Sequence, residues 1–245
     1  MQTILVIQSR RRPEILAEEQ AEYARATTGA ATLVFKNSLD ETEPWDSPEI
    51  LLGDAKAVII GGSGDLDFDG GREDGHEVRV TSKNLVRRLT PFINHLFAHD
   101  IPTLGICYGH QIIGEYSGTR VFHDTKQNKV GTFLVSLTDE GKTDPLFSTL
   151  PPIFQAQYGH KDSLESVPTG AALLAKGERC RTSALRYGRS IYTTQFHPEL
   201  TAEDARWKLA NSPGYLPEDV SVDSLVKESP EASALIPNFI RLFVQ

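Results

Sequence analysis

The chain has 245 residues but only two cysteines, few basic residues and no apolar run long enough to cross a bilayer, which takes roughly 18 or more residues. Cys107 and Cys180 lie far apart and form no C-x-x-C pair, which excludes a disulfide framework or a cysteine-rich zinc module. Lysine and arginine total 25 against 33 acidic residues, a net charge of −8. Nucleic-acid binders gain affinity by neutralising phosphates, so this balance argues against a general nucleic-acid partner.

We expect no targeting signal in the first residues of this sequence. Thr3–Ile7 is predicted to be a strand, and no basic segment precedes it as one would in a signal peptide. With 39% hydrophobic and 24% charged residues, the composition is that of an ordinary globular protein. We therefore expect a cytoplasmic protein without a membrane partner, built as one domain over residues 1–245.

The first half alternates short β-branched runs with longer amphipathic stretches. The predicted strands are Thr3–Ile7, Thr32–Phe35, Ala57–Ile60 and Thr103–Ile106. The predicted helices are Pro13–Ala26, Val78–His99 and Gln111–Tyr116. Strands that alternate with helices predict an α/β fold, a mostly parallel sheet with helices on both faces.

The second half contains little predicted helix, which indicates a smaller, mixed or antiparallel β portion. Its predicted strands are Lys129–Leu137, Ile153–Tyr158, Ala171–Ala175, Ser183–Tyr187 and Ile191–Phe196. Residues 211–230 contain three prolines and several acidic or hydroxyl residues, so they are predicted to be an exposed excursion. A closing helix is expected over 232–244.

The strongest chemical signal is Gly105-Ile106-Cys107-Tyr108-Gly109, between a predicted strand and a predicted helix. This is the G-x-nucleophile-x-G pattern of a nucleophile elbow, with cysteine as the nucleophile. The glycines leave room for segments that cross at the sharp turn, and the N-terminus of the following helix favours a thiolate. The alternative is a buried cysteine that packs as a small hydrophobe.

A cysteine nucleophile needs a base and a group that orients the base. His197-Pro198-Glu199 follows the apolar run Ile191–Phe196. Residues two apart in an extended segment point to the same side, so His197 and Glu199 are predicted to face one pocket. Glu199 would hold one imidazole nitrogen while the other faces Cys107.

A glycine loop, Gly61–Gly64, directly follows the strand Ala57–Ile60. In a parallel sheet this loop lies at the same edge as Cys107, and its N–H groups can turn toward a developing oxyanion. The third glycine of a dinucleotide-binding fingerprint is absent.

Together these motifs resemble the class I, triad-type glutamine amidotransferases over roughly residues 3 to 200, and His160–Asp162 is most similar to the branch around GMP synthase. The resemblance implies a flavodoxin-like three-layer fold and release of ammonia from glutamine through a glutamyl thioester. It implies that Cys107 is the nucleophile, that His197 is the base and then the acid, and that Glu199 orients His197. It further implies an oxyanion hole from the N–H groups of Gly62 and Tyr108. The residues that it implies for binding the backbone end of glutamine are Gln111, Gly159, His160, Lys161 and Asp162.

The resemblance implies neither a metal nor an organic cofactor, and it leaves the physiological substrate open. Family members often pass ammonia to a synthetase, either fused or separate. Three functions follow: glutamine hydrolysis with a separate synthetase partner, hydrolysis of γ-glutamyl conjugates by the same triad, or a regulatory role that depends on activation by a partner. A narrow leaving-group side of the pocket would suit ammonia, and a wide one would suit an amine.

Several other patterns compete with this interpretation. Asp65–Gly70 matches the first half of a calcium-binding EF-hand loop, but His76 occupies the position of the bidentate glutamate, so residues 65–77 are predicted to be a solvated acidic loop or an active-site lid. His95 and His99 are four residues apart on a predicted helix, where a solvated face is commoner than a metal site. Arg10–Arg12 is compatible with phosphate binding but also with an ordinary loop. Cys180 has no base or elbow around it.

Overall fold

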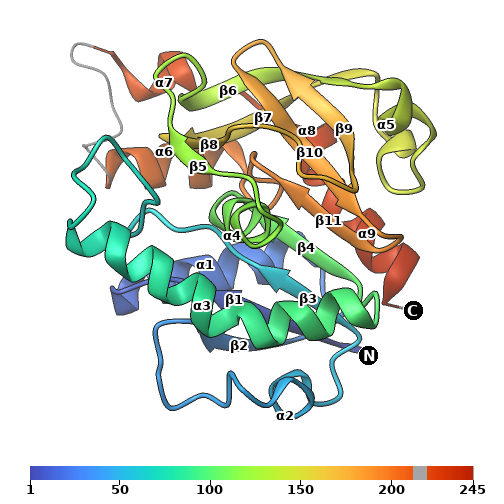
Figure 1. The fold of residues 1–245 in the computed structure, drawn as a ribbon. Coiled ribbons are helices and arrows are strands. Elements are labelled where there is room, and N and C mark those ends of the chain that lie inside the picture. The colour runs from blue at the N-terminus through green and yellow to red at the C-terminus, as the bar shows by residue number, and fades with distance from the viewer. Residues whose placement is uncertain (212–219, 245) are drawn as a thin grey trace.

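The computed structural model describes residues 1–211 and 220–244, and its main element is one nine-stranded sheet (Figure 1). In spatial order the strands are β2 (Thr32–Asn37), β1 (Thr3–Gln8), β3 (Ala57–Ile60), β4 (Thr103–Ile106), β11 (Ile191–Thr194), β10 (Cys180–Tyr187), β9 (Ala171–Gly177), β6 (Lys129–Leu137) and β7 (Ile153–His160). A separate antiparallel pair consists of β5 (Val121–His123) and β8 (Asp162–Leu164).

The sheet changes character at β11. The strands from β2 to β11 are parallel to one another, whereas β10, β9, β6 and β7 continue the same sheet in antiparallel pairing. Parallel neighbours need long crossovers, and the helical stretches of the first half supply them. The predicted α/β class with an additional antiparallel portion is confirmed, and the antiparallel strands extend the main sheet.

Helices cover both faces of the parallel strands. The helices of the described residues are α1 (Pro13–Ala26), α2 (Pro48–Leu52), α3 (Glu77–Ala98), α4 (Tyr108–Tyr116), α5 (Asp139–Thr143), α6 (Ala202–Ala210), α7 (Val222–Leu225), α8 (Pro230–Ser233) and α9 (Leu235–Phe243), with a 3-10 turn η1 (Phe147–Thr149). Successive side chains of a strand point to opposite faces. Ile4 and Val6 of β1 accordingly join a core with α1 and α9, while Leu5 and Ile7 join a second core with α3 and α4.

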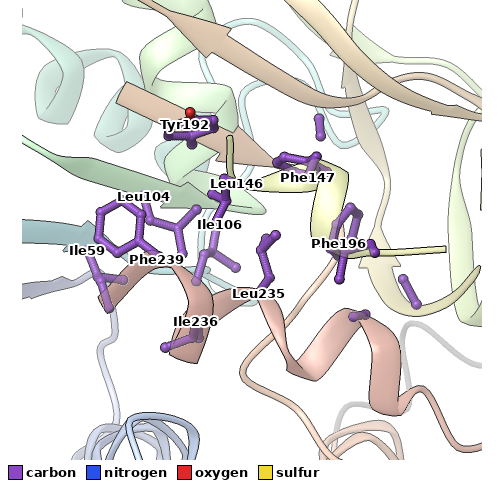
Figure 2. Packing of buried hydrophobic residues seen from close by; sticks show 14 of the residues in the cluster. Ile59, Leu104, Ile106, Leu146, Phe147, Tyr192, Phe196, Leu235, Ile236 and Phe239 are labelled. Carbon is purple, nitrogen blue, oxygen red and sulfur yellow. The ribbon is translucent and has the colours of Figure 1, made fainter. Parts of the chain in front are cut away.

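The chain's last helix closes the first of these cores. Leu235, Ile236 and Phe239 of α9 lie against Ile59 of β3 and against Leu104 and Ile106 of β4 (Figure 2). All of these side chains are fully buried. The closing helix therefore buries the face of the parallel strands that α3 and α4 leave uncovered.

Most predicted elements agree with the structure, which differs at some element ends and also contains elements that the sequence did not predict, among them α6 and the pair of β5 and β8. The helix expected from Gln111 begins at Tyr108, directly after the nucleophile candidate. The closing helix is divided at Ala234 into α8 and α9. Within the predicted excursion, residues 212–219 lie outside the described residues, and Val226 is buried against α6. No described helix has the length and apolarity to span a membrane.

The packing of α9 can be tested by truncating Phe239, which is fully buried. We expect Phe239→Ala to lower the free energy of unfolding by about 3–5 kcal/mol, because it removes buried surface and leaves a cavity. Leu242→Ala on the same helix, with a side chain that is 41% exposed, should change it by less than about 1 kcal/mol. Urea denaturation measures both, and equal values would contradict the docking of α9.

Candidate active site

Cys107 lies at a sharp turn between β4 and α4. Its backbone conformation is one that residues other than glycine rarely adopt. Its φ is 51° and its ψ is −97°. A β-carbon on Gly109 would lie 2.0 Å from the carbonyl oxygen of Ile60, and one on Gly105 would lie 3.0 Å from that of Gly109. The elbow therefore needs glycine at both positions, which is the reason for the spacing in the sequence.

Two backbone N–H groups near Cys107 are available to a ligand. Tyr108 is the first residue of α4, so its N–H has no partner within the helix. Neither this group nor the N–H of Gly62 donates a hydrogen bond to any residue within 1–211 or 220–244. Both residues are buried, so a negative charge placed against these two donors would be only weakly screened by water.

His197 and Glu199 follow β11 and are hydrogen-bonded to each other. The distance from His197 Nδ1 to Glu199 Oε1 is 2.7 Å, and both side chains are buried. The backbone N–H of His197 donates to the carbonyl of Gln157 on β7 at 2.9 Å. His197 is thus held at one imidazole nitrogen by the Glu199 carboxylate and at its backbone N–H by β7.

The charges around His197 favour its protonated form. Burial alone lowers the pKa of the imidazole, but the Glu199 carboxylate and the interaction with Cys107 raise it to about 10. A β-carbon on Gly62 would lie 3.0 Å from His197 Cε1 and 3.6 Å from Cys107 Cβ. The structure therefore brings the elbow, the His-Pro-Glu segment and the glycine loop together at one edge of the sheet.

One neighbour of Cys107 was missed by sequence reasoning. The side-chain amide of Gln195 donates toward Cys107 Sγ at 3.5 Å, and its oxygen accepts from Gln111 Nε2 at 3.3 Å. The sequence contained a signal for this contact. Gln195 lies two residues before His197, and residues two apart in an extended segment point to the same side.

Gln111, His160 and Asp162, which are among the residues predicted to bind the backbone end of glutamine, make hydrogen bonds inside the protein. Gln111 Nε2 donates to the backbone carbonyl of Asp162 at 2.8 Å, and His160 Nδ1 donates to the same carbonyl at 2.9 Å. Burial, together with nearby Lys129, lowers the pKa of His160 to about 3, so its ring is neutral. Gly159 lines a cavity. Lys161, two residues further along the chain, is half-buried.

The Asp162 side chain holds the acidic loop of residues 65–77. Its carboxylate accepts the backbone N–H groups of Phe68, Asp69 and Gly70 at 2.9, 2.8 and 2.7 Å. Phe68 is buried, and its ring centroid is 5.4 Å from that of Tyr108. The first part of the loop is therefore packed against the start of α4 rather than fully solvated.

A cavity of about 90 Å³ opens beside His197. The glycine loop contributes Ser63 and Gly64 to its wall, and β7 contributes Tyr158 and Gly159. Three charged residues complete this part of the wall. Arg10 and Arg12 come from the segment after β1, and Asp65 comes from the start of the acidic loop. The carboxyl edge of the parallel strands thus carries both the chemical groups and a space for a small molecule.

Comparisons with known proteins identify the family to which the chain belongs. A family model described as glutamine amidotransferase class-I matches residues 22–211, more than half of the chain. The chain is 42% identical over 112 residues to a GMP synthase (glutamine-hydrolyzing) of Borreliella burgdorferi, with 45% of this chain but only 21% of that protein covered. It is 28% identical over 154 residues to one subunit of the glutamine-hydrolyzing GMP synthase of Methanopyrus kandleri, with 62% of this chain and 71% of that protein covered.

Solved structures support the fold. A crystal structure of a glutamine amidotransferase from Thermotoga maritima matches with a TM-score of 0.72 at 17% identity, covering 100% of this chain and 98% of that one. The flavodoxin-like fold inferred from the sequence is thus shared, over nearly the full length of both chains, with this solved structure.

The coupling between His197 and Glu199 predicts a measurable titration. A pKa raised from 6.5 to about 10 means that protonated His197 stabilises the fold fully below pH 6.5, and that this contribution is lost as the pH rises toward 10. We expect Glu199→Gln to lower the pKa of His197, because the variant removes the adjacent negative charge. NMR titration of the His197 ring in both proteins measures the shift, with His160 as internal control. An unchanged pKa would show that Glu199 does not set the protonation of His197.

Proposed function

The chain belongs to the class I glutamine amidotransferases, and from this premise we propose that it hydrolyses the side-chain amide of glutamine with Cys107, His197 and Glu199. The observation that supports the proposal most directly is the convergence of a strained cysteine, a carboxylate-paired histidine and two unpaired N–H groups. A nucleophile, an oriented base and oxyanion donors are what acyl transfer requires.

In the first half of the reaction, Cys107 Sγ attacks the amide carbon of glutamine. A carbon–sulfur bond forms, and the carbonyl electrons move to the oxygen, where the N–H groups of Gly62 and Tyr108 stabilise the negative charge. His197, protonated at neutral pH, donates its proton to the leaving nitrogen. The carbon–nitrogen bond breaks, ammonia leaves, and a glutamyl thioester remains on Cys107.

Water completes the cycle. The now neutral His197 takes a proton from a water molecule, whose oxygen attacks the thioester carbon. The carbon–sulfur bond breaks, glutamate leaves, and the thiolate of Cys107 faces imidazolium again. Glu199 stabilises that imidazolium and fixes the ring through the 2.7 Å hydrogen bond to Nδ1. Every step uses only residues of this chain and water.

The fate of the ammonia is suggested by the relatives. The match covers 71% of a relative named as one subunit of a glutamine-hydrolyzing GMP synthase. By contrast, the chain spans only 20% to 28% of the matched relatives that are named as GMP synthases without a subunit. We propose that this chain likewise delivers ammonia to a separate synthetase subunit. Mixing it with the GMP synthetase subunit of the same organism tests this step. If no complex forms and glutamine hydrolysis does not rise, the proposed partner is wrong.

The catalytic roles can be tested by following glutamate and ammonia release from L-glutamine. We expect Cys107→Ala to lower the rate on the order of 10⁴-fold or more, because it removes the nucleophile. Glu199→Gln should lower kcat on the order of 10⁴-fold through loss of the oriented imidazolium.

Cys180→Ala is the matched control, since Cys180 is the other buried thiol and lies outside the triad. It should retain the wild-type rate. Equal activity of the Cys107→Ala and wild-type proteins would disprove the assignment of the nucleophile.

A further inference from the structure

The chain that follows the glycine loop is anchored at both ends of residues 65–70, the first part of the acidic loop. At the start, the N–H of Asp65 donates to Ser63 Oγ at 3.2 Å, and Asp65 Oδ2 accepts the backbone N–H of Arg11 at 3.0 Å. At the end, the Asp162 carboxylate accepts three successive backbone N–H groups at 2.7 to 2.9 Å. These residues, hereafter the clamp segment, are therefore tied both to the segment after β1 and to the start of β8.

The Asp162 anchor is buried, and both of its oxygens bind the clamp segment. Only 2% of Asp162 is exposed, and its Oδ2 accepts two of the three N–H groups while Oδ1 accepts the third. Hydrogen bonds to a charged acceptor are stronger than neutral ones, and a buried carboxylate needs them to replace water. Gly70 has a positive φ of 58°, and a β-carbon there would lie 2.6 Å from Asp67 Oδ2. The turn that aims the three N–H groups therefore requires glycine.

The middle of the clamp segment packs against the start of α4. Leu66 and Phe68 are buried in the core that α3 and α4 share, and the Phe68 ring centroid lies 5.4 Å from that of Tyr108. The Asp67 carbonyl between them accepts a hydrogen bond from Ser82 Oγ of α3 at 2.8 Å. The clamp segment is thus fixed to α3 as well, and its Phe68 ring supports the first residue of α4.

Both proposed oxyanion donors are attached to the clamp segment. Gly62 precedes Asp65 by three residues, and Tyr108 is the residue against which the Phe68 ring packs. We propose that Asp162 and Phe68 are positioning residues for the oxyanion hole. Asp162 fixes the clamp segment, and the clamp segment sets the spacing between the two N–H groups. This inference rests on the proposed glutamine hydrolysis and adds to it two residues that act through Gly62 and Tyr108.

The effect of such positioning is confined to the transition state. Negative charge on the carbonyl oxygen develops only when Cys107 attacks, so displaced donors cost little when glutamine binds and much when it reacts. A displacement of about 1 Å in an active site lowers a rate on the order of 10²-fold. A carboxylate that bound glutamine directly would instead lower the affinity for glutamine when it is replaced. The two roles of Asp162 therefore differ in what a substitution changes, which is kcat in one case and substrate binding in the other.

The test compares Phe68→Ala and Asp162→Asn with the wild-type enzyme in the hydrolysis of L-glutamine. Phe68→Leu is the conservative variant, because leucine restores part of the apolar contact with Tyr108. Phe97→Ala is the matched control, since the ring of Phe97 on α3 packs against Tyr116 at the opposite end of α4, with 5.2 Å between the ring centroids. Thermal unfolding shows which variants are folded, and Phe68→Leu carries the test if Phe68→Ala is not.

A second measurement separates the oxyanion hole from substrate binding. The aldehyde 5-oxopentanoate resembles glutamine with hydrogen in place of the amide nitrogen and of the α-amino group. The sulfur of Cys107 adds to its aldehyde carbon, and the carbonyl electron pair moves to the oxygen, as in the proposed reaction. Titration calorimetry of the aldehyde therefore reports on the tetrahedral adduct. Calorimetry of L-glutamine, with each variant combined with Cys107→Ala, reports on ground-state binding.

We expect Phe68→Ala and Asp162→Asn to lower kcat and kcat/KM equally, about 10- to 100-fold, and to weaken binding of 5-oxopentanoate to a similar degree. Binding of L-glutamine should be unchanged. Phe68→Leu should lie between Phe68→Ala and the wild type, and Phe97→Ala should match the wild type.

An unchanged kcat, or glutamine binding that weakens as much as aldehyde binding, would overturn the inference. Hydrolysis by the wild-type enzyme would in that case leave the proposed function intact. If the wild-type enzyme neither hydrolyses glutamine nor forms the aldehyde adduct, both proposals are overturned. If it forms the adduct without hydrolysing glutamine, the proposed function fails, and the aldehyde affinities of the Phe68 and Asp162 variants decide the inference.

Discussion

The close approach of α4 to the end of β3 is the contact on which the site depends. At Gly109 the helix backbone is so near the Ile60 carbonyl that no β-carbon fits, and the N–H of Gly109 donates to the Gly61 carbonyl at 3.1 Å. This packing forces Cys107 into its left-handed conformation, a strain on the order of 1–3 kcal/mol that the surrounding sheet must offset. Because Gly62 directly follows Gly61, the same contact positions both the proposed nucleophile and the N–H group proposed to stabilise the oxyanion.

Buried charge is the second constraint, because an unpaired ion in this interior would cost several kcal/mol. Beneath the site, Glu19 pairs with Arg10, and Glu199 pairs with His197. Glu22 of α1 lies 3.0 Å from Lys208 Nζ, and burial raises its pKa to about 7, with Glu199 among the charges that add to the effect. Among these carboxylates, Glu199 is the one whose charge raises the pKa of His197. The protonation of the proposed acid thus depends on Glu199 and on Cys107.

The sequence predicted the elbow, the histidine–glutamate pair and the fold class because each depends on local rules. Glycine spacing, the two-residue period of an extended segment and the shared edge of parallel strands placed Cys107, His197 and Gly62 together. Contacts between segments far apart in the sequence follow no such local spacing rule, so the sequence alone did not predict them. The Asp162 carboxylate binds the turn at residues 68–70, and Arg10 is positioned by Glu19 and the glycine loop. Their geometry depends on how segments far apart in the sequence pack together, which no single segment encodes.

The antiparallel half has a function beyond completing the sheet. Cys107, Gly62 and Arg10 all follow parallel strands, but His197 lies beyond β11, where the sheet changes direction. The His197 N–H donates to the Gln157 carbonyl of β7, which lies at the far end of the sheet's strand order. The chain after β11 therefore leaves the sheet and is secured by a strand that curls back over the site. That strand also supplies Gly159 to the cavity, so one element holds the proposed base, His197, and borders the cavity beside it.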